Sequence, residues 1–216
     1  MLRVALIALL AARPAYSCET ALLLSIDVSG SIDTGDYRLQ TDGLAAALQD
    51  PEVAAALIKG QVALAVVQWS GTGEQALVLP WQRMLSDPDV PRFAARAAAM
   101  PRAFQGSDTA VGQALRFATA KFAAVPDCGR RVIDISGDGQ ENAGFTDAAA
   151  RREAIDAGLI INAIAIEEAG AAIPITTYYR RWIISPGGFV LTARGLQDYA
   201  ETLRRKLLRE LTKSVG

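Results

Sequence analysis

Three short segments of this chain carry oxygen-bearing side chains at a spacing that suits a hard metal ion. Residues 27–31 read Asp-Val-Ser-Gly-Ser, which puts a carboxylate and two hydroxyls at alternate positions. In extended backbone these three groups would spread over about 13 Å, so they can meet at one point only if the chain curls, and Gly30 permits a curl. The other two segments are 106–109 (Gly-Ser-Asp-Thr) and 136–139 (Ser-Gly-Asp-Gly).

The oxygen donors in these segments predict the kind of ion that they would bind. Oxygen ligands alone favour Mg²⁺ or Mn²⁺ over zinc or copper. Because the hydroxyls are neutral, the ion would keep positive charge and an open position, and it would attract a carboxylate from outside. The set consists of two carboxylates and three hydroxyls: Asp27, Ser29, Ser31, Thr109 and Asp138.

The composition excludes several other chemistries. The 216 residues include no histidine and two cysteines. The chain therefore cannot build a Ser-His-Asp or Cys-His catalytic system, and it cannot complete a structural zinc site. The formal net charge is −1, and no basic cluster is interleaved with aromatic residues, so nucleic acid is not an expected partner.

Each segment also has a structural interpretation. Ser29, Ser31 and Thr109 could cap helices or loops, and Asp138 between two glycines could form a turn. The glycines around Asp138 resemble part of a dinucleotide-binding loop, but the segment lacks the G-x-G-x-x-G spacing. A degenerate fold that binds partners without a metal is a further possibility.

The enzymatic alternative is a metal-assisted hydrolase of the phosphatase type, with Asp27 as the nucleophile. The haloacid-dehalogenase pattern has a second Asp two residues after the nucleophile, and that position is Ser29 here. The three segments contain no lysine that could stabilise a transferring phosphate. The sequence therefore favours a non-catalytic binding module over this alternative.

Apolar stretches and amphipathic stretches alternate along the chain. They predict the strands and helices that position the three polar segments. The pattern predicts strands at 21–27, 62–69, 76–79, 132–136, 159–166 and 189–191. It predicts helices at 36–48, 89–99, 111–124, 146–157, 176–182 and 196–211, with Thr146 as a cap and Gly158 as a stop. Alanine-rich patches at 45–47, 54–56 and 97–99 also lie within helical patterns.

This alternation predicts the fold class and the place of the site. Apolar strands between helices indicate a doubly wound α/β sheet of six strands, mostly parallel, with helices on both faces. The tight loop at 71–74 makes the third strand an antiparallel edge strand. Ligands bind such sheets at the carboxyl ends of the strands, where the polar segments gather. Nothing in the middle resembles a linker, so residues 18–216 are expected to form one domain.

Residues 1–17 are expected to be a cleaved secretory signal. They begin Met-Leu-Arg, continue with nine apolar residues at 4–12 and end Ala-Tyr-Ser. Nine apolar residues are too few for a membrane anchor, which needs about 20. Lipidation of Cys18 is disfavoured by Ala15, where a large aliphatic residue is usual. Cleavage removes two arginines and no acid from 22 basic and 23 acidic residues, which leaves a net charge of −3 on a periplasmic or secreted protein.

The three segments together resemble the metal-ion-dependent adhesion site of a von Willebrand factor A domain. Thr109 stands in a T-x-x-G-x-A-L context, and residues 136–139 close a strand. More narrowly, the chain resembles an uncharacterised bacterial family of exported A-like proteins. That resemblance rests on the stretch 131–139, on Trp69, on Pro80-Trp81, on Tyr178-Tyr179 and on the strand at 187–190, and it covers residues 18–211.

The resemblance implies roles for individual residues. Ser29, Ser31 and Thr109 would coordinate the metal directly, and Asp27 and Asp138 would act directly or through water. The partner would be a protein or peptide that offers a carboxylate. Asp108 departs from the wider superfamily, which usually has Gly before this threonine, and the departure raises the possibility of a third carboxylate.

The strand order of A domains also implies a pairing of the two cysteines. In that order the first and fourth strands are parallel neighbours. Cys18 lies nine residues before Asp27 and Cys128 lies ten before Asp138, so both should lie at the amino edge of the sheet. A Cys18–Cys128 disulfide is expected there, about 30 Å from the metal site, and two free thiols are the alternative.

Asp134 is a charged residue within an otherwise apolar strand. A buried carboxylate needs polar partners or a raised pKa. Ser25 and Asn162 are the polar residues on the predicted flanking strands. The sequence therefore predicts a hydrogen-bonded polar belt across three strands.

Overall fold

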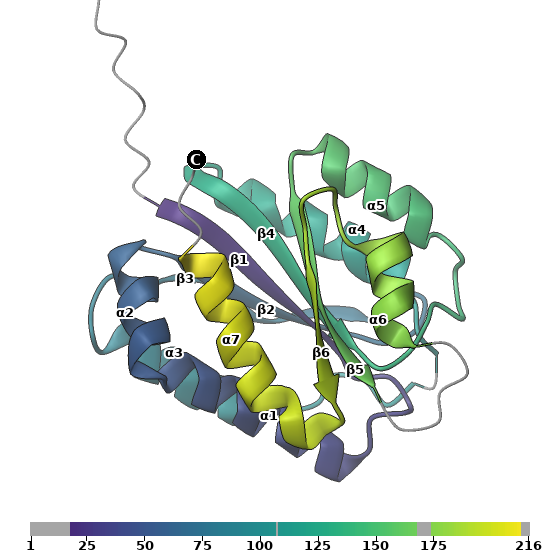
Figure 1. Ribbon diagram of the computed structural model, residues 1–216, viewed down its shortest axis with the longest axis horizontal. Helices are drawn as coiled ribbons and strands as arrows, with labels where there is room; N and C mark the ends of the chain where they lie inside the picture. The colour runs from purple at the N-terminus through teal and green to yellow at the C-terminus, as the bar shows by residue number, and fades with distance from the viewer. Residues whose placement is uncertain (1–17, 107, 168–173, 213–216) are drawn as a thin grey trace, which may run out of the picture.

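A computed structural model describes residues 18–106, 108–167 and 174–212, and within these residues six strands form one sheet (Figure 1). The strand order is β3-β2-β1-β4-β5-β6. β3 is antiparallel to β2, and the other neighbours are parallel. The bounds are β1 Cys18–Asp27, β2 Ala63–Trp69, β3 Gln75–Arg83, β4 Cys128–Gly137, β5 Ile160–Glu167 and β6 Val190–Arg194. The predicted doubly wound sheet with one antiparallel edge strand is confirmed.

Helices cover both faces of the sheet, as predicted (Figure 1). One face is covered by α1 (Thr34–Gln49), α2 (Pro51–Lys59), α3 (Asp89–Ala98) and α7 (Tyr199–Leu211). The other face is covered by α4 (Val111–Lys121), α5 (Asp147–Asp156) and α6 (Ile175–Tyr178). Between the sheet and each layer lies a separate apolar core.

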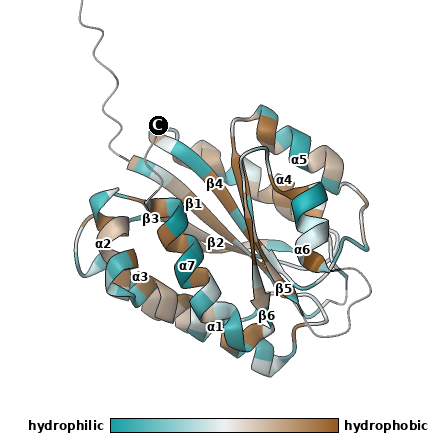
Figure 2. Ribbon diagram, in the orientation of Figure 1, coloured by the Kyte–Doolittle hydropathy of each residue, from teal (hydrophilic) through white to brown (hydrophobic). Residues whose placement is uncertain are grey.

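The central strands are apolar on both faces because each face meets a helical layer. Leu22 and Leu24 of β1 pack into one core, and Leu23 packs into the other. All seven residues of β2 are buried. The hydropathy colouring in Figure 2 shows the same division, with brown strands inside and teal residues on the helices outside. A run of apolar residues without alternation therefore marks an interior parallel strand here.

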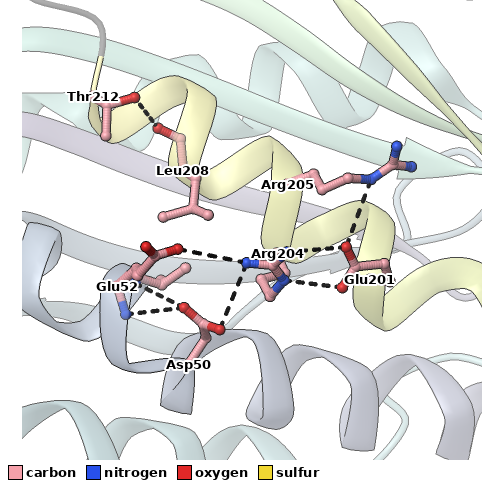
Figure 3. Close-up of polar contacts among 8 residues, drawn as sticks. Asp50, Glu52, Glu201, Arg204, Arg205, Leu208 and Thr212 are labelled. Atoms are coloured by element: carbon pink, nitrogen blue, oxygen red, sulfur yellow. Dashed lines mark hydrogen bonds and ion pairs between the residues drawn. The ribbon is translucent and has the colours of Figure 1, made fainter.

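The structure contains a helix, α2, that was not among the predicted helices, although the alanine patch at 54–56 indicated helical structure there. α2 begins directly after Asp50, whose side chain accepts hydrogen bonds from the backbone of Glu52 and Val53. Arg204 of α7 forms ion pairs with three acidic residues (Figure 3). Its Nη1 lies 3.7 Å from Asp50 Oδ2 and 3.8 Å from Glu52 Oε2, and its Nε lies 2.9 Å from Glu201 Oε2. Such partly exposed ion pairs contribute little stability, so apolar burial of α2 holds it in place.

Other element boundaries differ from prediction where the helical geometry changes. The predicted helix at 176–182 is α6 followed by a π-helical turn, Tyr179–Ile183. The predicted helix at 196–211 begins with a 3₁₀ turn, Leu196–Asp198, before α7. Thr146 stands at the predicted cap position of α5, but its side chain makes no capping hydrogen bond. Gly158 ends that helix with a φ of +76°, as expected for a glycine stop.

The two cysteines meet at the amino edge of the sheet. Cys18 and Cys128 are register partners on β1 and β4, with their Cα atoms 4.4 Å apart, and they form a disulfide. The predicted pairing is confirmed. Its physical basis is that two parallel strands in register carry their first residues side by side.

Asp134 lies in a buried charged cluster on the face covered by α7. Lys206 Nζ lies 2.6 Å from Asp134 Oδ1 and 2.7 Å from Glu210 Oε1. Asn162 Nδ2 donates a hydrogen bond of 2.7 Å to Glu210 Oε1. Burial is the largest influence on the Asp134 carboxyl and raises its pKa to about 7, against the opposing effect of Lys206.

The predicted polar belt across three strands is therefore wrong in its membership. Leu24, not Ser25, is the register partner of Asp134, so Ser25 points to the opposite face of the sheet. Asn162 is a register partner of Asp134. Asp134 and Asn162 instead contact Lys206 and Glu210 of α7, which strand neighbourhood alone could not predict. Asn162 Oδ1 also accepts a hydrogen bond of 3.0 Å from Phe189 N.

The predicted signal segment, residues 1–17, lies outside the described residues. Within the described part of the chain, no helix combines the length and the apolar character that a membrane crossing requires.

Candidate metal centre

The polar segments meet at the switch point of the sheet, where β1 and β4 lie side by side and the chain leaves them in opposite directions. Asp27 is the last residue of β1, and Asp138 directly follows β4. Thr109 lies two residues before α4. This is the edge at which doubly wound sheets bind ligands.

Short contacts link the five predicted ligands. Ser31 Oγ donates a hydrogen bond of 2.7 Å to Asp138 Oδ1. Ser29 Oγ lies 3.5 Å from Ser31 Oγ and 3.4 Å from Thr109 Oγ1. The fifth, Asp27, accepts a hydrogen bond of 2.8 Å from the backbone N–H of Ser29 through Oδ1. The structure thus brings all five predicted residues together from three separate parts of the chain.

The loop after β1 curls through a tight turn. Ile32 N donates to Ser29 O at 3.0 Å, and Asp33 then caps the start of α1 through a reciprocal interaction with Asp36. Gly30 is not among the glycines with positive φ. The curl predicted from Gly30 is present, but it does not use the left-handed backbone conformation that favours glycine.

Thr109 is held by a residue that the sequence did not indicate. Its backbone N–H donates to Asn142 Oδ1 at 2.8 Å, and Asn142 N donates back to Thr109 O at 3.0 Å. A β-carbon on Gly139 would lie 3.2 Å from Thr109 Oγ1. Asn142 follows no helical or strand period, so its role depends on the loop geometry alone.

Gly137 leaves room for two buried oxygens. A β-carbon there would lie 2.6 Å from Tyr179 Oη and 2.8 Å from Asp27 Oδ2. Both oxygens are buried, and neither has a hydrogen-bond partner among the described residues. Tyr179 is fully buried. A fully buried carboxylate oxygen without a partner is rare and calls for an explanation.

The electrostatics of Asp27 fit a cation-binding role. Its pKa is raised to about 7, first by burial and then by the neighbouring charge of Asp138. The hydrogen bonds from Ser29 and the charge of Arg102 act in the opposite direction. A divalent ion would offset the buried negative charge and give Oδ2 a partner. The donor set and this oxygen therefore fit a hard cation.

Asp108 does not extend the acidic set. Among the described residues, no three acidic or cysteine side chains form a group that could hold a metal ion. A β-carbon on Gly71 would lie 3.3 Å from Asp108 Cβ, which places Asp108 against the turn between β2 and β3. Any ion at this site would therefore depend on hydroxyl ligands as well as on Asp27 and Asp138.

A comparison of sequences assigns the chain to a family. The family model described as "Protein of unknown function (DUF1194)" matches residues 17–215. The chain belongs to the DUF1194 family. Comparison of this DUF1194 chain with curated proteins finds no match.

Solved structures confirm the von Willebrand factor A fold for this DUF1194 chain. Proximal thread matrix protein 1 (PTMP1) from the mussel byssus has a TM-score of 0.68 and 19% identity, over 90% of this chain and 48% of the mussel chain. The von Willebrand factor type A structure from Catenulispora acidiphila has a TM-score of 0.65 and 20% identity, over 92% and 44% of the two chains. The von Willebrand factor domain of the type V pili tip protein Mfa5 from Porphyromonas gingivalis has a TM-score of 0.65 and 9% identity, over 92% and 97%.

These similarities have a defined extent. The DUF1194 chain spans about half the length of the mussel protein. Another structure of that mussel protein is described as having a zinc-occupied metal-ion-dependent adhesion site motif. At 19% identity the likeness establishes the fold of the DUF1194 chain alone.

Proposed function

We propose that this protein is an exported binding module that holds a divalent cation at the switch point of its sheet and uses it to bind a carboxylate on a protein or peptide. The observation that carries the proposal is Asp27 Oδ2, which is buried without a hydrogen-bond partner among the described residues, beside three hydroxyls and a second carboxylate.

The side chains of Asp27, Ser29, Ser31, Thr109 and Asp138 would hold the ion. When bound, the ion supplies a positive charge that a carboxylate from outside can approach. The two carboxylates of the site cancel the formal charge of a divalent ion, but Asp138 is only half-buried and its Oδ1 already accepts a hydrogen bond from the hydroxyl of Ser31. Neutral hydroxyls leave the ion electrophilic, which favours an anionic partner.

The identity of the ion is a separate question. Oxygen ligands favour Mg²⁺ or Mn²⁺. The zinc-occupied motif of the mussel protein shows that an A-type fold also accepts zinc. Mg²⁺ or Mn²⁺ is therefore the proposed native ion. The affinity of the protein for Zn²⁺ should be measured beside its affinities for these two ions.

Export is the second part of the proposal. The Cys18–Cys128 disulfide supports an oxidising compartment, because cytosolic thiols are generally kept reduced. Pilus and byssus proteins among the structural neighbours support an extracellular or surface setting. The signal segment at 1–17 would deliver the domain to the periplasm or the medium.

The test is cation-dependent thermal stabilisation of the mature domain. We expect millimolar Mg²⁺ or Mn²⁺ to raise the Tm of chelator-treated wild type, by mass action on the folded state. Asp27→Asn and Asp138→Asn should remove the shift, since each loses a charged ligand. The control is Asp42→Asn, an exposed position on α1. A wild type without a shift, or site variants with a shift as large as that of wild type, would refute the metal site.

The hydrolase alternative receives no support from the geometry. Lys206 is buried beneath the sheet against Asp134 and is unavailable to a phosphate at the site. Turnover of a generic phosphate ester that Asp27→Asn abolishes would favour the hydrolase over the binding module.

A further inference from the structure

Arg102 reaches the metal loop, defined as residues 28–31, from a distant part of the chain. Its Nη2 donates hydrogen bonds of 2.8 Å to Val28 O and 2.9 Å to Ser29 O, and its Nε lies 3.3 Å from Val28 O. One half-buried guanidinium thus binds two successive carbonyls of the loop that carries Ser29 and Ser31.

Arg102 is the side chain that reaches the carbonyl oxygens of Val28 and Ser29 in this loop. Val28 N donates to Trp69 O at 2.9 Å, which fixes the beginning of the loop to β2. Val28 and Ser29 are fully buried, so their carbonyls need partners inside the protein. An open pocket of about 460 Å³ borders the loop at the exposed Gly30, whereas Val28 and the following Ile32 pack in the apolar core.

The segment that carries Arg102 is itself anchored by buried polar groups. Gln68 of β2 accepts a hydrogen bond of 2.7 Å from Ala103 N, and its Nε2 donates to Tyr37 Oη at 2.8 Å. Tyr37 Oη in turn donates to Met100 O at 2.8 Å. Gln68 is fully buried. The position of Arg102 is therefore set by the sheet and α1, independently of the loop that it binds.

We propose that Arg102 is a positioning residue for the metal centre. By fixing the carbonyls of Val28 and Ser29, it sets the curl that turns the hydroxyls of Ser29 and Ser31 toward the same point. It touches neither the ion nor the ligand in this role. The proposal rests on the proposed metal site, because it assigns Arg102 to the support of that site.

Arg102→Gln tests the role, because glutamine keeps a donor but loses the planar fork and the reach. We expect the dissociation constant for Mn²⁺, measured by calorimetry on the mature domain, to rise about 10- to 100-fold, the usual effect of removing a residue that orients metal ligands. Arg102→Lys should restore part of the affinity, since lysine can donate to one carbonyl at a time. Arg96→Gln is the matched control: an exposed arginine on α3 that donates to Gln82 Oε1.

The Tm of each variant in chelator separates positioning from simple support of the fold. A lower Tm for Arg102→Gln with wild-type Mn²⁺ affinity would overturn the proposal, as would equal losses of affinity in Arg102→Gln and Arg96→Gln. If Arg102→Gln fails to fold, Arg102→Lys decides the matter, with wild-type affinity counting against the proposal. A wild type that binds no cation refutes the metal site itself, and the positioning role with it.

Discussion

At the scale of single residues, the site contains groups that weaken the fold. Asp27 is a fully buried carboxylate, and neither its Oδ2 nor Tyr179 Oη beside Gly137 has a hydrogen-bond partner in the part of the chain that the structure describes. A protein selected for stability alone would pair or remove such groups. Their presence at the carboxyl edge of the central strands is consistent with a site that a ligand completes.

Phe145 is a second costly residue, in the loop that follows Asn142. Its side chain is 81% exposed, and its backbone φ is +50°, a conformation that is unfavourable for residues with a β-carbon. We expect Phe145→Gly to raise the free energy of unfolding by about 0.5–1 kcal/mol, because relief of the strain exceeds the entropy that glycine adds to the unfolded chain. Urea denaturation measures this change.

Phe145→Ser is the control for that prediction. Serine removes the ring but keeps the β-carbon, so it should give no comparable gain. A loss of stability in Phe145→Gly would show that the exposed ring supports the fold.

At the scale of elements, the link between the sheet and α7 depends on charge. Lys206 is shared by Asp134 and Glu210, so the cluster carries one more acid than base when fully ionised. Asn162 donates a hydrogen bond to Glu210 of the cluster. Lys206 Nζ lies 5.3 Å from the ring centre of Phe189, and Tyr199 of α7 is also near Asp134. Replacing such a cluster with apolar residues can be neutral or stabilising, so it is weak evidence for stability.

This cluster predicts a pH dependence. The Asp134 carboxyl has a pKa of about 7 in the fold, against 3.8 in the unfolded chain. Between these values the folded protein holds a proton that the unfolded chain has released, so the free energy of unfolding falls as pH rises from about 4 to 7, by at most about 4 kcal/mol. We expect Asp134→Asn to reduce this decrease in the free energy of unfolding between about pH 4 and 7, as measured by urea titrations with chelator present.

Two comparisons isolate Asp134 in this experiment. Asp27 contributes a fall of the same sign to wild type and variant alike, because its pKa is also raised to about 7. Asp156→Asn, at an exposed position of α5, should leave the profile unchanged. A variant that keeps the full wild-type fall would contradict the assignment to Asp134.

At the scale of the whole molecule, the amino ends and the carboxyl ends of β1 and β4 carry different features. Their amino ends are joined by the disulfide, and their carboxyl ends lead into the candidate metal centre. The disulfide closes a loop of 110 residues that includes β2, β3 and the first four helices. It can therefore restrict the unfolded chain without touching the site.

We expect the double variant Cys18→Ser/Cys128→Ser to lose about 4–5 kcal/mol of unfolding free energy, the chain-entropy value for a loop of this length. Cation-induced stabilisation should persist, because the ion site lies at the opposite edge. Thermal and urea unfolding, each with and without Mg²⁺, measure both effects. Reduction of the wild type should reproduce the loss. A variant that unfolds as wild type does would show that the bridge adds no stability.

Local patterns in the sequence determined most of the fold. Unbroken apolar runs identified the interior strands, the tight loop at 71–74 identified the antiparallel edge, and Gly158 marked the end of α5. The von Willebrand resemblance then supplied the neighbourhood of β1 and β4, and with it the disulfide. These features are readable because each depends on residues close together in the chain or on a known strand order.

The tertiary structure decided which distant side chains meet. Arg102 lies more than 70 residues from the loop that it binds, and Asn142 more than 30 from Thr109. Lys206 reaches Asp134 from the last helix, where the sequence had suggested Ser25. No period or turn signal encodes such contacts, because they depend on how whole layers pack. The sequence by itself therefore predicted the five candidate ligands. Packing decided that Asp27 is buried, with no partner for its Oδ2 among residues 18–106, 108–167 and 174–212, and that Arg102 binds the loop beside it.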